Sequence, residues 1–448
     1  MLASAEERDV RTMLLGTQRI NAQGHLEVGG CDTVQLAKQF GTPLYVLDED
    51  CFRANCRAYQ QAFAPRCPGT VISYAGKALI NLAVCRIAEQ EGLGLDVVSA
   101  GELHTALQAG FPTDRILFHG ANKTREELEM VIEHRVGRLV LDSLEEIAAL
   151  QELAAARGAV VEALLRVSPG VTADTHYHIQ TGKTDTKFGF SMIGGAGEEA
   201  VGRVLAAPNL ALRGFHCHIG SQILDLEPFA QAGRLMVDFA ADMREAMGLE
   251  VWDLDMGGGL GVRYLPEQQP PSVEQFAEAL VTAITLRCQE RNLPRPRLLL
   301  EPGRSLVGEA GLTLYRVGIV KEIAGLRTYV TVDGSLADNP RPALYGARYD
   351  AIVANKAAQP RTRKVTVSGR SCETDTLIVD LHTPDIRAGD VLAVQTTGAY
   401  NHAMASNYNR FSRPAMALVS NGSAEVIVER ESLQDLVRMD RVPERLRR

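Results

Sequence analysis

From residue 44 onward, the sequence alternates between short β-branched runs and amphipathic stretches with helical spacing. For example, "LYVLDED" precedes "CFRANCRAYQQAF", and "TVISYAGKA" precedes "INLAVCRIAEQEG". At least eight such strand-then-helix units follow one another, up to the run "RLLLEPGR". Strands interleaved with helices in this way form a parallel sheet. Eight units over roughly 250 residues predict a (β/α)8 barrel of the TIM type over 44–312, with a doubly wound sheet as the structural alternative.

The pattern changes after about residue 312, where short strands such as "TYVTVDGSL" and "TLIVDLH" are separated by turn residues. This predicts an antiparallel β-domain over 313–448. The N-terminal run "INAQGHLEVGG" has the pattern of a hairpin, so we expect residues 1–43 to join the β-domain. The predicted fold class is therefore α/β plus β, in two domains.

Composition excludes several classes of protein. The net charge of −8, without a basic stripe, argues against a nucleic-acid partner. The eight cysteines form no CxxC pair, which favours reduced thiols over a zinc site. No apolar run reaches the ~18 residues of a membrane span, and the charged N-terminus lacks the apolar core of a signal peptide. We therefore expect a cytoplasmic protein with no membrane partner.

Lys77 ends the predicted strand "SYAGKA", and barrel enzymes carry their catalytic side chains at the carboxyl ends of the strands. A lysine at this place could extend to solvent. It could also be a Schiff-base lysine, which needs a partly desolvated pocket so that its amine can be neutral. The spacing alone leaves both interpretations open.

Two further strand ends carry residues suited to an anionic or aromatic ligand. The run "MGGGLG" at 256–261 could bring backbone N–H groups close to a phosphate, or could be a flexible loop. It is not a GxGxxG motif, so it does not indicate a dinucleotide site. Glu301, at the start of "EPGRS", could pair with Arg304 or could hold a protonated pyridine nitrogen.

The run "HCHIGSQ" places His216 and His218 two residues apart, so on a strand their side chains share a face. A metal site would need further ligands, and no carboxylate stands at a matching spacing. We therefore predict no metal, and favour a ring stacked on a flat cofactor with Ser221 donating to a phosphate.

In the predicted β-domain, Cys372 stands beside Glu373 in "SGRSCETDTL", and Tyr400 lies in a loop flanked by glycine. A cysteine is often only a small buried apolar side chain. Because Cys372 stands next to the charged Glu373, a functional role for the cysteine is the alternative interpretation.

Taken together, these segments resemble the fold type III pyridoxal-phosphate (PLP) decarboxylases, the family that includes the ornithine, diaminopimelate and arginine decarboxylases. The diaminopimelate branch is the nearest. "DGSLADNPRPALYGARY" at 333–349 looks like its substrate-carboxylate motif, and the runs at 94–103 and 175–190 also match its pattern. The resemblance extends from about residue 15 to about residue 420, with the motifs in the expected order.

The resemblance implies decarboxylation of meso-2,6-diaminopimelate to L-lysine and CO2, the last step of lysine biosynthesis, with PLP as the cofactor. By resemblance, Lys77 holds the cofactor covalently, Asp96 positions Lys77, and His218 stacks on the ring. The remaining implied cofactor-binding residues are Ser221, Gly257, Gly258, Gly259, Glu301, Pro302, Gly303, Arg304 and Tyr400. Glu301 is expected at the pyridine nitrogen.

The resemblance also implies how the substrate is bound. Arg304, Arg341 and Tyr345 are expected to bind the retained carboxylate, and Glu373 the retained amine. Tyr400 is expected to contact phosphate or substrate. Cys372 is expected to protonate the carbon that has lost CO2, and to come from the partner subunit of a homodimer. One departure from the family's "YAxKAN" pattern is Leu79, which we expect to leave the function of Lys77 intact.

Related activities remain as alternatives. Ornithine or arginine decarboxylation would leave Arg341 and Tyr345 without a second carboxylate to bind, and carboxynorspermidine decarboxylation is harder to separate. An amino-acid racemase should not need the "SCE" motif. A catalytically inactive PLP-binding regulator would bind the cofactor but release no CO2.

Overall fold

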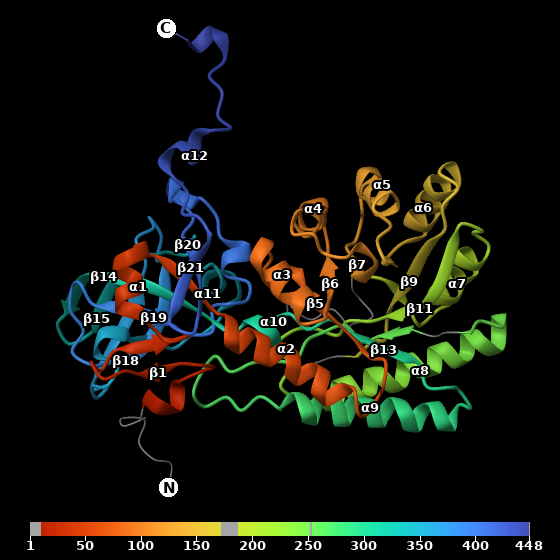
Figure 1. Ribbon diagram of the computed structural model, residues 1–448, viewed down its shortest axis with the longest axis horizontal. Helices are drawn as coiled ribbons and strands as arrows, with labels where there is room; N and C mark the ends of the chain where they lie inside the picture. The colour runs from red at the N-terminus through yellow and green to blue at the C-terminus, as the bar shows by residue number, and fades with distance from the viewer. Residues whose placement is uncertain (1–9, 172–186, 251–252, 448) are drawn as a thin grey trace. The chain divides into compact units, whose positions relative to one another are not determined.

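The computed structural model describes residues 10–171, 187–250 and 253–447. The chain forms two compact units (Figure 1). One, here called the β unit, takes in the chain up to Phe52, residues 263–268 and residues from 308 onward. The other, the barrel unit, comprises residues 53–262 and 269–307.

The barrel unit contains a closed ring of eight parallel strands, because β13 pairs with β5 and completes the circle. This confirms the predicted barrel and excludes the doubly wound sheet. In chain order the strands are β5 (Val71–Ala75), β6 (Gly94–Val97), β7 (Ile116–Phe118), β8 (Arg138–Leu141), β9 (Val161–Ser168), β11 (Leu210–His216), β12 (Asp253–Asp255) and β13 (Arg297–Leu300). A short strand, β10 (Phe190–Ser191), adds to β9.

Helices follow the strands and surround them (Figure 1). They are α3 (Leu82–Gln90), α4 (Ala100–Gln108), α5 (Arg125–Glu133), α6 (Leu144–Ala156), α7 (Ala196–Leu205), α8 (Glu227–Met247), α9 (Val273–Glu290) and the short α10 (Arg304–Val307), with α2 (Glu49–Phe63) preceding β5. Their starts are set locally. Ser99 and Ser143, for example, accept hydrogen bonds from backbone N–H groups in the first turns of α4 and α6. Strands β6 and β8 therefore lead into short polar turns, where functional side chains can project.

The β unit is built on a nine-stranded sheet, whose main path runs β18-β17-β15-β14-β4-β20-β21. Its strands are β4 (Leu44–Asp48), β14 (Gly311–Ile323), β15 (Arg327–Val332), β16 (Ala351–Val353), β17 (Arg363–Ser368), β18 (Thr376–Thr383), β19 (Val391–Val394), β20 (Ala415–Ser420) and β21 (Ser423–Val428). The sheet is mixed rather than purely antiparallel, because β15–β17 and β4–β20 pair in parallel. Turn signals in the sequence reveal hairpins, but not pairings between distant strands.

Strand β4 lies in this sheet, paired with β14 and β20, and not in the barrel, where the strand-helix pattern from residue 44 had placed it. All five of its residues are buried. A strand covered on both faces is apolar throughout in either kind of sheet, so its sequence cannot show which sheet it joins. The compact units accordingly divide the chain near 52 and 308, whereas the sequence pattern suggested 44 and 312.

The N-terminal segment forms a small sheet of its own, β1 (Arg19–Ile20), β2 (Leu26–Val28) and β3 (Cys31–Asp32), followed by α1 (Thr33–Phe40). Buried side chains of this segment, including Leu26 and Leu36, share one hydrophobic core with Leu312 and Ala417 of the large sheet. The short remaining helices are α11 (Arg341–Tyr345) and α12 (Leu433–Val437).

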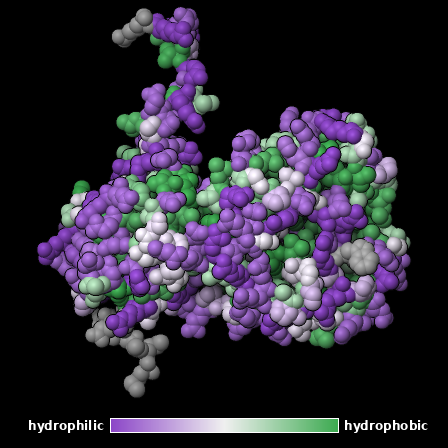
Figure 2. All heavy atoms as spheres, viewed as in Figure 1, coloured by the Kyte–Doolittle hydropathy of each residue, from purple (hydrophilic) through white to green (hydrophobic). Residues whose placement is uncertain are grey.

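Two surface properties bear on partners. No helix among the described residues is long and apolar enough to cross a membrane. On the face drawn in Figure 2, hydrophilic side chains predominate and hydrophobic ones lie in scattered groups.

Candidate active site

Lys77 follows β5 directly, in a single turn of 3-10 helix over Gly76–Ala78. Its Nζ lies 4.0 Å from Oδ2 of Asp96 on the neighbouring strand β6. The Asp96 side chain is 1% exposed, whereas the Lys77 side chain is 39% exposed. A buried carboxylate thus anchors an amine that remains accessible. Leu79, two residues further, is buried, and its carbonyl accepts a hydrogen bond from Tyr74.

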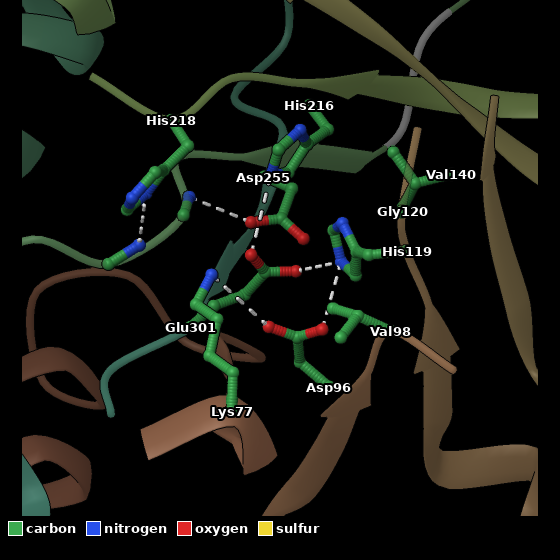
Figure 3. A network of polar contacts seen from close by, with 12 residues as sticks. Lys77, Asp96, Val98, His119, Gly120, Val140, His216, His218, Asp255 and Glu301 are labelled. Atoms are coloured by element: carbon green, nitrogen blue, oxygen red, sulfur yellow. Dashed lines mark hydrogen bonds and ion pairs between the residues drawn. The ribbon is translucent and has the colours of Figure 1, made fainter. Parts of the chain in front are cut away.

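Glu301, at the carboxyl end of β13, lies between two imidazoles (Figure 3). His119, from the end of β7, places Nε2 2.5 Å from Oε1 of Glu301. His216, the last residue of β11, places Nε2 3.3 Å from Oε2. These three side chains could be taken for metal ligands. Glu301 is a carboxylate that the sequence spacing around His216 and His218 did not reveal.

The electrostatics of this cluster keep Glu301 ionised. Burial alone would raise its pKa, but the interactions with His119 and His216 outweigh burial and hold the pKa well below its usual range. Burial lowers the pKa of His216 to about 3, so this ring is neutral at neutral pH and donates its N–H to the carboxylate.

Asp255, the last residue of β12, is a further buried carboxyl group of this cluster. Burial first, and then the charge of Glu301, raise its pKa well above the usual range. Its Oδ1 accepts a hydrogen bond of 2.9 Å from the backbone N–H of Gly257. Asp255 therefore ties the glycine run to the same cluster as Glu301.

The glycine run packs too closely for side chains. A Cβ on Gly258 would lie 2.2 Å from the carbonyl oxygen of Glu301, and one on Gly259, whose φ is +120°, would lie 2.5 Å from the carbonyl oxygen of Gly220. The N–H of Gly258 also donates to Nδ1 of His218 at 3.3 Å. Burial, together with the charge of Lys77, lowers the pKa of His218, so this ring is neutral.

Arg304, the first residue of α10, is buried and donates to Oγ of Ser221 through Nη2 at 2.9 Å and Nε at 3.2 Å. Pro302 and Gly303, between Glu301 and Arg304, pack on strand β5. The Pro302 carbonyl accepts from the N–H of Ala75, and a Cβ on Gly303 would meet the Ala75 side chain at 3.0 Å. The predicted "EPGR" run therefore joins β13 to the strand that leads to Lys77.

These residues fit PLP. An ionised buried carboxylate suits a pyridinium N–H, a glycine run and Ser221 suit a phosphate, a neutral imidazole suits a flat ring, and an accessible lysine suits an aldehyde. The barrel unit thus carries, at or after the carboxyl ends of its strands, the predicted residues Lys77, Asp96, His218, Ser221, Gly257 to Gly259 and Glu301 to Arg304.

In the β unit, the structure brings the predicted Arg341, Tyr345 and Tyr400 together. Arg341 begins α11 and is buried, and the centres of the Tyr345 and Tyr400 rings each lie 6.0 Å from its guanidinium carbon. Such distances are typical of cation–π contacts. Tyr400 adopts a positive φ of 62°, and the following Asn401 is fully buried.

Cys372 and Glu373 are exposed, on the loop between β17 and β18. Buried Asp375 shapes this loop by accepting hydrogen bonds from the backbone N–H groups of Leu336 and Ser371. Tyr408 donates a hydrogen bond of 2.5 Å to Glu373. The loop thus holds both predicted side chains at the surface of the β unit.

Sequence reasoning missed several residues of the site. His119 and Asp255 stand at strand ends like the predicted residues, but the same is true of other polar residues, so that position alone did not single them out. Lys123 was also missed. Its buried ammonium group donates to Glu146 and to the carbonyls of Gly120 and Val140, and so fastens the turn that carries His119. Of the motif at 175–190, residues 175–186 lie outside the described residues.

Comparisons with known proteins agree with this geometry. The family model "Pyridoxal-dependent decarboxylase, pyridoxal binding domain" matches residues 49–308. A diaminopimelate decarboxylase of Bacillus subtilis is 45% identical over 428 residues, which cover 95% of this chain and 98% of that protein. A diaminopimelate decarboxylase of Synechocystis is 43% identical over 441 residues, covering 96% and 93%.

Among solved structures, a diaminopimelate decarboxylase from M. jannaschii in complex with L-lysine is 36% identical, with a TM-score of 0.90 and coverage of 97% of this chain and 100% of that one. The fold and the strand-end cluster define a pyridoxal-dependent decarboxylase. The chain belongs to this class and, within it, to the diaminopimelate decarboxylase family.

Proposed function

We propose that this protein removes one carboxylate from meso-2,6-diaminopimelate, with PLP as cofactor, to give L-lysine and CO2. The observation that carries the cofactor half of the proposal is the buried, ionised Glu301 between two imidazoles, on the same barrel end as Lys77. Full-length similarity to diaminopimelate decarboxylases supports the substrate.

When bound, PLP supplies an electron sink for the electron pair that the departing CO2 leaves behind. In the barrel unit, Lys77 would hold the cofactor through Nζ, and Asp96 would orient that amine. Glu301 would keep a proton on the ring nitrogen, because its carboxylate is ionised and buried. His218 would pack on the ring. Ser221, Arg304 and the glycine run would lie against the phosphate, although the N–H groups of Gly257 and Gly258 already donate to Asp255 and His218.

In the β unit, Arg341 and Tyr345 would bind the substrate carboxylate that is retained in the product. A guanidinium can bind a carboxylate with two parallel hydrogen bonds. Ornithine has no second carboxylate, so its decarboxylation would leave this guanidinium without that ligand. Glu373 would bind the retained amine, and Cys372 would deliver a proton from Sγ to the carbon that has lost CO2. Arg304 and Tyr400 are further candidates for substrate contacts.

The test is to mix the purified protein with PLP and meso-2,6-diaminopimelate and to measure lysine and CO2. We expect equal amounts of both, and none without PLP. Ornithine, arginine and carboxynorspermidine serve as competing substrates. Preferred turnover of one of these would replace the proposal with a related decarboxylase, and a PLP absorbance band with no CO2 from any substrate would indicate a regulatory binding protein.

The proposal includes a cytoplasmic homodimer in which Cys372 of each subunit completes its partner's site. It can be tested by reassembling Lys77→Ala together with Cys372→Ala, both inactive alone. Random pairing makes about half of the dimers mixed, and each mixed dimer has one intact site, so about a quarter of all sites should recover. Confirmed subunit exchange without recovered turnover would show that Cys372 serves its own chain.

A further inference from the structure

Arg341 has an unusual environment for a cation. It is 5% exposed, and the centres of four tyrosine rings lie 5.3–6.0 Å from its guanidinium carbon. They belong to Tyr264, Tyr345, Tyr349 and Tyr400. Within the described part of the chain, no carboxylate forms an ion pair with Arg341. Burying a cation without an anion is costly, so this arrangement is suited to an anionic ligand.

One edge of the guanidinium is already occupied. Nη1 donates to the hydroxyl of Tyr264 at 2.8 Å and to that of Tyr349 at 3.0 Å. A guanidinium carries five N–H donors, and those on Nε and Nη2 have no hydrogen-bond partner among the described residues. Nε and Nη2 lie on one edge of the group and together match the two oxygens of a carboxylate.

A chain of hydrogen bonds fixes the direction of this contact. Asn401 donates from Nδ2 to Oδ1 of Asn339 at 2.7 Å, so its own Oδ1 faces Tyr349 and accepts from that hydroxyl at 3.2 Å. Because the Tyr349 hydroxyl gives its proton to Asn401, it must present a lone pair to Arg341. Asn339, Tyr349 and Asn401 are all buried, so water does not compete for these bonds.

We propose that Tyr349 and Asn401 are positioning residues that orient Arg341 toward the carboxylate retained by the substrate, and that they thereby set the preference for an amino acid over the corresponding amine. This inference rests on the proposed function for the identity of the substrate. The inference is based on two observations about Arg341. Its Nη1 already donates to two tyrosine hydroxyls, and its Nε and Nη2 have no hydrogen-bond partner among the described residues.

The experiment compares two competitors of the PLP-loaded enzyme, lysine and cadaverine, which differ only in the carboxylate. In Tyr349→Phe the ring remains and only the hydroxyl is lost. We expect the KM for diaminopimelate and the inhibition constant of lysine each to rise about tenfold, the effect of losing one buried hydrogen bond to a charged group. The inhibition constant of cadaverine, kcat and the PLP absorbance should stay nearly unchanged.

The matched control is Tyr329→Phe, in strand β15, whose ring lies over Arg327 and not in the tyrosine cluster around Arg341. The Tyr329→Phe substitution should leave the inhibition constants of lysine and cadaverine unchanged. Asn401→Leu should act in the same direction as Tyr349→Phe, and the double variant should be no worse than Tyr349→Phe alone, because Asn401 acts through the Tyr349 hydroxyl. If Asn401→Leu does not fold, Tyr349→Phe decides the question.

The positioning role would be overturned if, in Tyr349→Phe, the inhibition constants of lysine and cadaverine rose equally, or if that of lysine did not rise. Competitor binding can also be followed by the PLP absorbance, without turnover. A wild-type protein that makes no lysine would therefore refute the proposed function, while the ratio of lysine to cadaverine binding would still test the positioning role.

Discussion

The barrel unit and the β unit bury charge in different ways. Around Glu301, the barrel unit gathers three carboxylates, two imidazoles and the amine of Lys77 in one network (Figure 3). Around Arg341, the β unit gathers tyrosine rings and amides, and the described residues supply no carboxylate.

The difference indicates different tasks. In the barrel cluster, neighbouring carboxyl and imidazole groups fix one another's protonation states before any ligand arrives, which suits a site that must hold a proton on a cofactor. The guanidinium of the β unit lacks a protein anion and is stabilised by neutral groups. The binding of a carboxylate therefore gives this site a large electrostatic stabilisation. Changes in the first region should therefore affect the cofactor, and changes in the second should affect the substrate.

The largest effect is expected for Lys77→Ala. Turnover should fall by more than about a thousandfold, because the only proposed covalent anchor of PLP is removed. The absorbance band of the covalently held cofactor should vanish, as a spectrum of the purified variant would show. An unchanged band would place the anchor elsewhere and would remove Lys77 from the site.

Glu301→Gln should follow, with kcat lowered about 10²–10³-fold, since a neutral amide no longer stabilises a proton on the ring nitrogen. KM for diaminopimelate should change little, because Glu301 is assigned to the cofactor. Steady-state kinetics at saturating PLP measures both quantities. An effect confined to KM would contradict the division of tasks between the two units.

Arg341→Ala should show the reverse pattern. Leaving the substrate carboxylate unpaired should cost about 2–4 kcal/mol, seen as a higher KM for diaminopimelate, while PLP affinity is retained. Arg341→Lys is the informative control, because it keeps the charge but loses the two-pronged geometry. If KM does not move in either variant, the carboxylate is bound by another residue.

The smallest effect concerns stability against pH. Since the folded pKa of His216 is about 3 and its unfolded value near 6.5, the unfolded chain binds the extra proton between these values. Its contribution to folding stability should therefore decrease as pH falls below 6.5, by about 1.4 kcal/mol per pH unit. Urea unfolding at pH 7, 6 and 5 should show a shallower loss for His216→Gln than for the wild type. Parallel curves would mean that His216 titrates alike in both states.

Several candidate residues of the barrel unit stood out in the sequence because they share one local signature. Lys77, Glu301 and the glycine run each stand directly after a buried parallel strand, and parallel strands end at the same edge. His119 and Asp255 carry the same signature, but no pattern in the sequence distinguishes them from other polar residues after strands. Their importance follows from contacts with Glu301.

The Arg341 cluster was predictable only in part. Arg341 and Tyr345 stand close together in one motif, whereas Tyr264 and Asn401 come from segments far away in the chain. The same limit applies to β4, whose apolar sequence suits either sheet and whose partners β14 and β20 lie more than 250 residues away.

The strand-helix periodicity, a local property of the sequence, by itself determined the barrel and the separate sheet, and motifs that resemble a known family supplied the candidate cofactor and substrate residues. Only the tertiary structure decided which sheet β4 joins, which side chains surround Glu301, and how Arg341 is held. Those outcomes depend on contacts between segments far apart in the chain, and on the burial that makes such contacts strong.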